Sequence, residues 1–131
     1  IMIKKKLINS KDNRGIIVDI FENDPKEHCT LVTFNKKAIR GNHFHKKTIQ
    51  YSFVLDGKLE MYTCRVNKNG NYLGKKKKKI VKKYDLIKHM PYVAHAFKAL
   101  KKSDLLAFAD GERGGKNYEK DTFRLDVKLT K

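Results

Sequence analysis

Two histidines one residue apart, His43 and His45, are the side chains of this sequence best suited to chemistry. Residues two positions apart on a β-strand face the same side of a sheet, so both imidazoles can point into one pocket. Imidazole is the side chain whose ordinary pKa lies near neutrality, and it is also the commonest metal ligand. The pair therefore predicts a site that either transfers protons or binds a metal ion.

Short extended segments surround this pair along the chain. Runs of β-branched and aromatic residues end at turn residues, and we expect strands at residues 15–21, 29–34, 50–55, 58–66, 84–89, 94–100 and 104–109. Asp56-Gly57, between two of these runs, is a strong hairpin signal. No window has the apolar spacing of a long amphipathic helix. We therefore expect an all-β fold of about ten short antiparallel strands, in a sandwich or a barrel.

Three other segments have weaker patterns. Residues 72–80 are polar and rich in lysine, residues 111–122 are typical of a loop, and residues 123–129 fit either a final strand or a short helix. A chain of 131 residues is long enough to bury about two thirds of its unfolded surface in one core, with no room for a second. We expect a single domain over residues 1–131.

The first eight residues have no pattern typical of membrane insertion or secretion. They are too few and too interrupted by lysine for a spanning helix, and they lack the apolar run and the small-residue cleavage site of a secretory signal. We therefore expect a soluble, cytoplasmic protein with no membrane partner.

The formal net charge of +17 raises the question of nucleic-acid binding. The lysines are spread along the chain, only residues 75–79 form a block, and no aromatic residues alternate with that block. A charge run of this kind usually reports a solvated surface, so a nucleic-acid partner is not expected. The same charge would suit a substrate that carries a diphosphate, although it attracts any polyanion.

The spacing of the histidine pair resembles that of the cupin superfamily. The pair, Gln50 and Gly57 match the first cupin motif with one substitution, because an acidic residue usually stands where this chain has Gln50. Residues 84–97 resemble the second motif, which contains a histidine at the position of His95. The resemblance covers residues 40–110, and it implies a cupin-type jelly-roll β-barrel.

The substitution at Gln50 bears on metal binding. Metal-binding cupins resemble a cage of three histidines and one glutamate, and a neutral amide is a poor ligand for a divalent ion. We therefore expect no metal and no cofactor. A zinc site built by His43, His45 and His95 alone stays open, because three protein ligands plus water is a known catalytic arrangement.

The segment RGNHFHKKTIQ, residues 40–50, closely resembles the motif of the nucleotide-sugar 3,4-ketoisomerases. These cupins act on dTDP-linked 4-keto-6-deoxyhexoses, on the way to the amino sugars of surface polysaccharides. The resemblance implies an isomerase whose partner is a dTDP-linked keto sugar and whose catalytic residues are His43 and His45. A carbon acid next to a ketone needs a base near neutrality and a donor for the enolate oxygen, and two imidazoles could serve the proton transfers through an enediol.

Two alternatives stay open. The chain is also similar to the dTDP-4-keto-6-deoxyglucose 3,5-epimerases, which share the Arg-Gly-x-His opening and an Ala-His pair like Ala94-His95. Those enzymes have a glutamine where this chain has His45, and a lysine near the place of Ser52, so the motif favours the isomerase. A cupin can also bind sugar without turnover.

Four more residues are expected to contact substrate: Arg40, Gln50, Tyr92 and His95. A guanidinium suits bidentate contact with hydroxyl or diphosphate groups. Gln50 either contacts substrate or holds His45 in one tautomer, and His95 either lines the pocket or packs in the core. Tyr51 and Tyr92 are possible acids, although alternation turns Tyr51 toward the opposite face of its sheet.

The remaining expectations concern assembly and the other histidines. Cupins of this kind resemble homodimers, and the outward apolar positions Tyr51, Phe53 and Leu55 fit a buried second face. His28 and His89 lie outside the motif positions, and no role is assigned to them.

Overall fold

The computed structural model describes residues 2–111 and 120–131, in which the regular structure is almost entirely strand. The strands are β1 (Met2–Lys5), β2 (Ser10–Asp12), β3 (Gly15–Ile17), β4 (His28–Phe34), β5 (Ile39–Phe44), β6 (Gln50–Asp56), β7 (Lys58–Val66), β8 (Tyr72–Lys82), β9 (Asp85–His89), β10 (Val93–Ala99), β11 (Ser103–Ala109) and β12 (Phe123–Arg124). The all-β prediction is confirmed. Most of the loop expected over residues 111–122 lies outside the described residues. No described helix has the length and apolar character needed to cross a bilayer.

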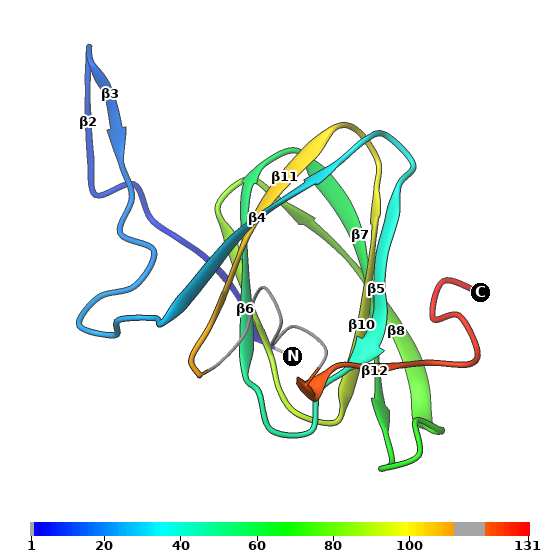
Figure 1. Ribbon diagram of the computed structural model, residues 1–131. Coiled ribbons are helices and arrows are strands. Elements are labelled where there is room, and N and C mark those ends of the chain that lie inside the picture. Colours follow the sequence, from blue (N-terminus) through cyan, green and yellow to red (C-terminus); the bar gives the residue numbers. More distant parts are fainter. Residues whose placement is uncertain (1, 112–119) are drawn as a thin grey trace.

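Ten of the strands form two five-stranded antiparallel sheets that face each other (Figure 1). The first sheet has the order β1-β9-β6-β11-β4, and the second has the order β12-β5-β10-β7-β8. The hairpin of β2 and β3 stands away from this barrel (Figure 1). Each motif contributes one strand to each sheet, and in the second sheet β5, which carries His43, pairs directly with β10, which carries His95.

Two segments differ from what their sequence patterns indicated. The apolar run 15–21 was expected to be one strand, but only residues 15–17 are extended, as half of the projecting hairpin. The lysine-rich segment is the eleven-residue strand β8 at the edge of the second sheet, where Val81 is buried and the lysines are exposed. An edge strand with solvent on its outer side tolerates charge, and the lysines oppose pairing with another chain.

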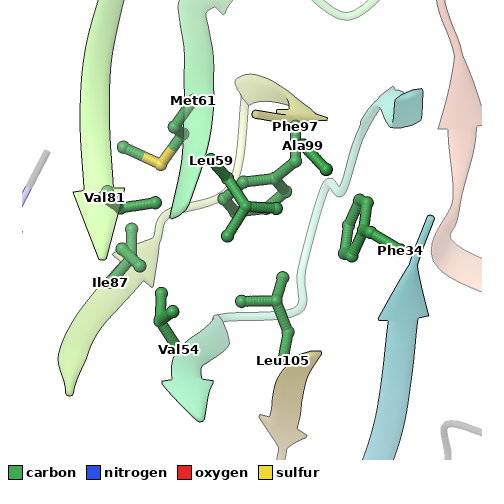
Figure 2. Packing of buried hydrophobic residues seen from close by; sticks show 9 residues of the cluster. All are labelled: Phe34, Val54, Leu59, Met61, Val81, Ile87, Phe97, Ala99 and Leu105. Atoms are coloured by element: carbon green, nitrogen blue, oxygen red, sulfur yellow. The ribbon is translucent and has the colours of Figure 1, made fainter. Parts of the chain in front are cut away.

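The core lies between the inner faces of the two sheets at one end of the barrel. Strand alternation directs apolar side chains from both sheets toward one another (Figure 2), and each fully buried one stabilises the fold by about 1.5–3 kcal/mol. The buried cluster consists of Phe34, Val54, Leu59, Met61, Val81, Ile87, Phe97, Ala99 and Leu105.

A second cluster covers the outer face of the second sheet. Ala94 and Ala96 alternate with the inward residues of β10, and Leu125 and Leu129 of the C-terminal segment pack against them. Asn42 holds this segment in place, because its backbone carbonyl accepts from Leu125 N and its side-chain Oδ1 accepts from Leu129 N. The C-terminal segment therefore supports the strand that carries the histidine pair.

Candidate active site

A β-bulge in β5 brings the arginine and the first histidine of the motif to the same side of the sheet. Strand β10 pairs His95 with His43 and Ala96 with Gly41, so Asn42 is the extra residue. In a regular strand Arg40 and His43 would face opposite sides, because they are three positions apart. With the bulge, both line one cavity.

Gly41 is required at this bulge. Its φ is +94°, in the region that L side chains rarely adopt, and a Cβ there would lie 2.9 Å from the backbone oxygen of His95. The motif glycine thus allows the two motif strands to approach each other closely.

Four histidine rings gather inside the barrel. The ring centroids of His43 and His95 lie 4.7 Å apart, those of His43 and His45 5.2 Å apart, and those of His45 and His95 5.5 Å apart. His89 adds a fourth ring, 4.3 Å from that of His95. The structure therefore brings together the three histidines that the two motifs predicted and adds one to which no role was assigned.

His45 has a hydrogen-bond partner on each ring nitrogen. Its Nδ1 lies 2.6 Å from the backbone carbonyl oxygen of Asp121, which can only accept, so Nδ1 carries a hydrogen. Its Nε2 lies 3.0 Å from Oε1 of Gln50. In a neutral ring with its hydrogen on Nδ1, Nε2 can only accept a hydrogen bond. The Gln50 amide supplies the donor when its oxygen and nitrogen are exchanged by a flip of the side-chain amide. Of the two roles expected for Gln50, the geometry favours holding His45 in one tautomer.

Asp121 anchors the loop between the histidine pair and Gln50. Its carboxylate accepts hydrogen bonds from the backbone N–H groups of Lys46, Lys47 and Thr48 at 2.7–3.0 Å. Burial opposes ionisation, but these bonds outweigh it and lower the pKa of Asp121 to about 2. Sequence reasoning missed this residue because it lies far from both motifs and belongs to no pattern.

His89, to which the sequence assigned no role, is a buried member of the cluster. Its Nε2 lies 2.9 Å from Oγ of Ser52, and both residues are buried. Burial, together with the neighbouring histidines, lowers the pKa of His89 to about 3. Burial, together with the neighbouring His89, His43 and His45, also lowers the pKa of His95. Both rings are therefore neutral near pH 7.

The cavity beside the histidines has a volume of about 810 Å³, within the range of about 300–1,000 Å³ usual for small-molecule sites. His43, Gln50, Ser52 and His95 line it, and it borders the apolar core. His28 lines it as well, which its position outside the motifs did not indicate. The cavity thus combines polar groups able to transfer protons with an apolar wall.

Two arginines lie at the exposed border of this cavity. Arg40 donates from Nε to the Thr33 carbonyl at 3.0 Å, and its guanidinium lies over the ring of Phe34. Arg124 of β12 lines the same cavity beside His43, its partner in the strand register. Guanidinium groups suit anionic oxygens. Sequence reasoning found Arg40 through the motif but had no signal for Arg124.

The structure does not bring Tyr92 to the cavity. Its ring lies 6.2 Å from that of Phe44, which belongs to the cluster on the outer face of the second sheet. Tyr51 faces outward as expected, with its ring 5.2 Å from that of Phe21. Neither tyrosine considered as an acid lines the cavity.

Three of the histidines have the geometry of a possible metal site. Each of His43, His45 and His95 offers a ligand atom, and these atoms lie within 4.8 Å of one another. Three imidazoles suit zinc and other transition metals. Nδ1 of His45, however, is bonded to the Asp121 carbonyl, which leaves Nε2 as its metal ligand atom. Binding a metal ion through Nε2 would break the hydrogen bond between His45 and Gln50.

Comparison with known proteins assigns the chain to a family. The profile described as "Polysaccharide biosynthesis C-terminal domain" matches residues 10–123, which is most of the chain. The chain belongs to this family. A search of curated protein sequences finds no match.

This polysaccharide biosynthesis C-terminal domain is also similar to solved structures. It is similar to QdtA, a sugar 3,4-ketoisomerase from Thermoanaerobacterium thermosaccharolyticum in complex with TDP, with a TM-score of 0.75, 18% identity, and coverage of 95% of this chain and 88% of that one. It is also similar to the dTDP-4-dehydrorhamnose 3,5-epimerase of Sulfolobus tokodaii, with a TM-score of 0.67, 21% identity, and coverage of 79% and 66%.

A third similar structure is longer than this chain. The capsular polysaccharide assembling protein CapF of Staphylococcus aureus matches with a TM-score of 0.66 and 19% identity, over 93% of this chain and 33% of CapF. The chain thus spans just under two thirds of the Sulfolobus epimerase and one third of CapF. At these identities the similarity shows the fold, and it confirms the cupin-type jelly roll and the resemblance to ketoisomerases and epimerases.

Proposed function

We propose that the chain is a nucleotide-sugar isomerase that moves the carbonyl group of a dTDP-linked 4-keto-6-deoxyhexose from C4 to C3, in the synthesis of deoxyamino sugars for surface polysaccharides. The observation that carries the proposal is the bulge at Gly41 and Asn42, which presents Arg40 and His43 to the same cavity. A base and a cationic group in one cavity fit a substrate that joins a carbon acid to a diphosphate.

His43 is the group that removes the C3 proton in this proposal. It lines the cavity and is half-buried, whereas His45 is 1% exposed and held at both ring nitrogens. Loss of the C3 proton moves its electron pair into a C3–C4 double bond, and the C4 carbonyl oxygen takes up a proton to give an enediol. The C3 hydroxyl then loses its proton as C4 gains one, so the step is an isomerisation without a redox partner.

His45 acts as a positioning residue in this account. Both motif histidines were expected to transfer protons, but each ring nitrogen of His45 already has a partner. Its bond to Gln50 fixes the amide that lines the cavity next to His43. Gln50 is thereby held where it can contact a substrate hydroxyl.

Arg40 and Arg124 bind the diphosphate in this proposal. Both line the cavity and are exposed at its border, where the nucleotide part of a substrate would leave the barrel. The net charge of +17 adds attraction for such an anion. In the similar QdtA structure the bound molecule is TDP, which supports this choice of ligand.

The epimerase is the second candidate. A 3,5-epimerase needs an acid on the opposite face of the sugar ring, and a tyrosine was the expected acid. Within the described residues, the rings of Tyr51 and Tyr92 pack against Phe21 and Phe44, away from the cavity lining, and neither of these two tyrosines is placed to act as the epimerase acid. This placement favours the isomerase. A cupin that binds the sugar nucleotide without turnover is the third candidate.

One experiment distinguishes the three. The protein is incubated with dTDP-4-keto-6-deoxyglucose in deuterated water and the sugar is followed by NMR. Migration of the carbonyl to C3 supports the isomerase, whereas deuterium at both C3 and C5 with an unmoved carbonyl supports the epimerase. Saturable binding with an unchanged sugar leaves only the binding module.

Two further expectations stay predictions: that residues 1–131 form one domain, and that the protein is cytoplasmic.

A further inference from the structure

We propose that the hydroxyl of Ser52, oriented by His89, donates the hydrogen bond that stabilises the enolate oxygen at C4 during the isomerisation. This inference rests on the proposed function and assigns a group that the reaction needs. Ser52 would touch the reacting oxygen and keep its proton throughout, while His89 would act through Ser52 as a positioning residue.

The first support is the placement of the serine. Gln50, Ser52 and Val54 alternate along β6 and face the inside of the barrel, with Val54 in the apolar core. Ser52 is 1% exposed and yet lines the same cavity as His43. A serine at this depth is shielded from bulk solvent, and at such a place a hydrogen bond is stronger than in water.

The second support is the direction of the bond to His89. The ring is neutral because it is buried, so one of its nitrogens carries a hydrogen and the other does not. Nε2 lies 2.9 Å from the Ser52 Oγ, and Nδ1 has no partner within the described part of the chain. An unpaired buried N–H is rarer than an unpaired acceptor, so the hydrogen belongs on Nε2.

This tautomer determines what Ser52 can do. When His89 donates from Nε2, the Ser52 oxygen accepts and its own hydrogen has to point elsewhere. The bond to His89 is the one that the Ser52 side chain makes within the described residues, and the open space beside it is the cavity. Ser52 is therefore a donor aimed at whatever oxygen occupies the cavity.

Other cavity donors are less suited to this task. Gln50 is held by His45, and Arg40 lies at the exposed border, bonded to the Thr33 carbonyl. A preorganised buried donor to a developing oxyanion typically contributes about 10²–10³-fold in kcat. A neutral hydroxyl also fits an enediol mechanism. It carries no positive charge that would bind the C4 carbonyl oxygen tightly in the ground state, so its hydrogen bond favours the charged oxygen that develops later.

The test compares Ser52→Ala with Ser103→Ala, which removes another buried serine hydroxyl at a place outside the cavity lining. We expect Ser52→Ala to lower kcat about 10²–10³-fold. Its dissociation constant for dTDP should stay within about twofold of the wild type, since dTDP lacks the reacting oxygen. Ser103→Ala should lose stability but keep kcat within about twofold. Turnover by Ser52→Ala at the wild-type rate would overturn the role of Ser52 and leave the proposed function standing.

His89 is tested separately by its tautomer and by rescue. Nitrogen NMR of the wild-type protein should show the hydrogen on Nε2, and a hydrogen on Nδ1 would overturn the proposal without any need for turnover or a folded variant. His89→Gln keeps an amide donor near the Nε2 position, whereas His89→Phe does not. The glutamine variant should therefore retain more kcat than the phenylalanine variant, and equal losses would contradict the positioning role. If the wild type itself does not isomerise the sugar, the proposed function fails and the role of Ser52 fails with it.

Discussion

Gln50 shows how a single side chain changes what a cluster of histidines can do. A carboxylate in its place would complete a metal cage with His43, His45 and His95. The amide instead fills the hydrogen-bonding capacity of His45 and leaves His43 beside the cavity. The choice between metal binding and proton transfer therefore depends on this position.

The first prediction follows from that dependence. Gln50→Glu should create a site of three imidazoles and one carboxylate, so the variant should retain zinc or nickel through dialysis. The wild-type protein should release the metal under the same conditions, and its isomerase activity should survive treatment with EDTA. Metal content by mass spectrometry and turnover before and after EDTA check both statements. Loss of wild-type activity with EDTA, restored by a divalent metal, would contradict the metal-free account.

Only some of the site residues could be predicted from the sequence. His43, Gln50 and His95 belong to spaced motifs, and the structure does bring them to one cavity. Arg124 reaches the cavity through long-range strand pairing, and Asp121 reaches the loop beside the histidine pair through backbone hydrogen bonds; no local pattern encodes either contact. Residues of this second kind require the fold before their roles become visible.

Ser52 and His89 failed to stand out for a different reason. Each alternates normally along its strand, and only the register of β6 and β9 brings the hydroxyl and the imidazole together. Tyr92 illustrates the opposite error, since it lies within the second motif yet packs against Phe44 on the outer face of the sheet.

At the scale of elements, the bulge in β5 is the feature on which the site depends. It adds Asn42 to the strand and turns Arg40 toward the cavity. It also ties the C-terminal segment to the sheet, because the backbone carbonyl and the side-chain Oδ1 of Asn42 both accept hydrogen bonds from that segment. Bulges of this kind commonly aim a side chain at an active site. Simple strand alternation could predict that His43 and His45 face alike, but it could not predict that Arg40 joins them.

The second prediction tests the bulge. Gly41→Ala should be destabilised by about 1–3 kcal/mol, because alanine is strained at a φ of +94° and its Cβ would approach the His95 oxygen to 2.9 Å. Gly74→Ala is the matched control, since Gly74 has a φ of +81° and nothing within 4 Å of the added Cβ. Thermal unfolding should show a lower melting temperature for both variants, with the larger decrease for Gly41→Ala. Only Gly41→Ala should lose turnover. Equal turnover in the two variants would contradict the claim that the active site depends on the bulge.

At the scale of the whole molecule, the buried histidines link folding to pH. His89 and His95 stay neutral in the folded protein, whereas in the unfolded chain they titrate near 6.5. Below pH 6.5 the unfolded state therefore binds more protons than the folded state, and the free energy of unfolding decreases as the pH falls. Asp121 acts in a lower window, because its stabilising contribution is lost only as the pH falls below about 3.8 toward 2.

The third prediction follows from this linkage. Urea unfolding should show a stability that is constant between pH 7.5 and 8.5, and that falls below pH 6.5 by up to about 1.4 kcal/mol per pH unit for each buried histidine. His89→Gln should show a shallower fall, because one titrating group has been removed. A stability that does not change between pH 7 and pH 5 would contradict the burial of these rings.

The fourth prediction concerns assembly, and we expect a homodimer. The outer face of the first sheet presents Leu31 and Leu55, which are 59% and 40% exposed, whereas Phe53 is already buried within the chain. A stable interface typically covers about 800 Å² on each partner, and we expect it to include these leucines. Sedimentation should give twice the mass of the chain, and Leu31→Glu should shift it toward the monomer. A wild-type protein that sediments as a monomer at micromolar concentration would exclude this arrangement.

The most direct test of the account is the effect of His43→Asn on carbonyl migration in dTDP-4-keto-6-deoxyglucose, followed by NMR. Removing a general base should slow migration by about 10²–10⁴-fold, while dTDP binding measured by calorimetry stays at the wild-type level because Arg40 and Arg124 are intact. Asparagine keeps a polar side chain of similar size at this half-buried position, so the fold should persist. Migration at the wild-type rate in a folded His43→Asn protein would contradict the assignment of His43 as the base.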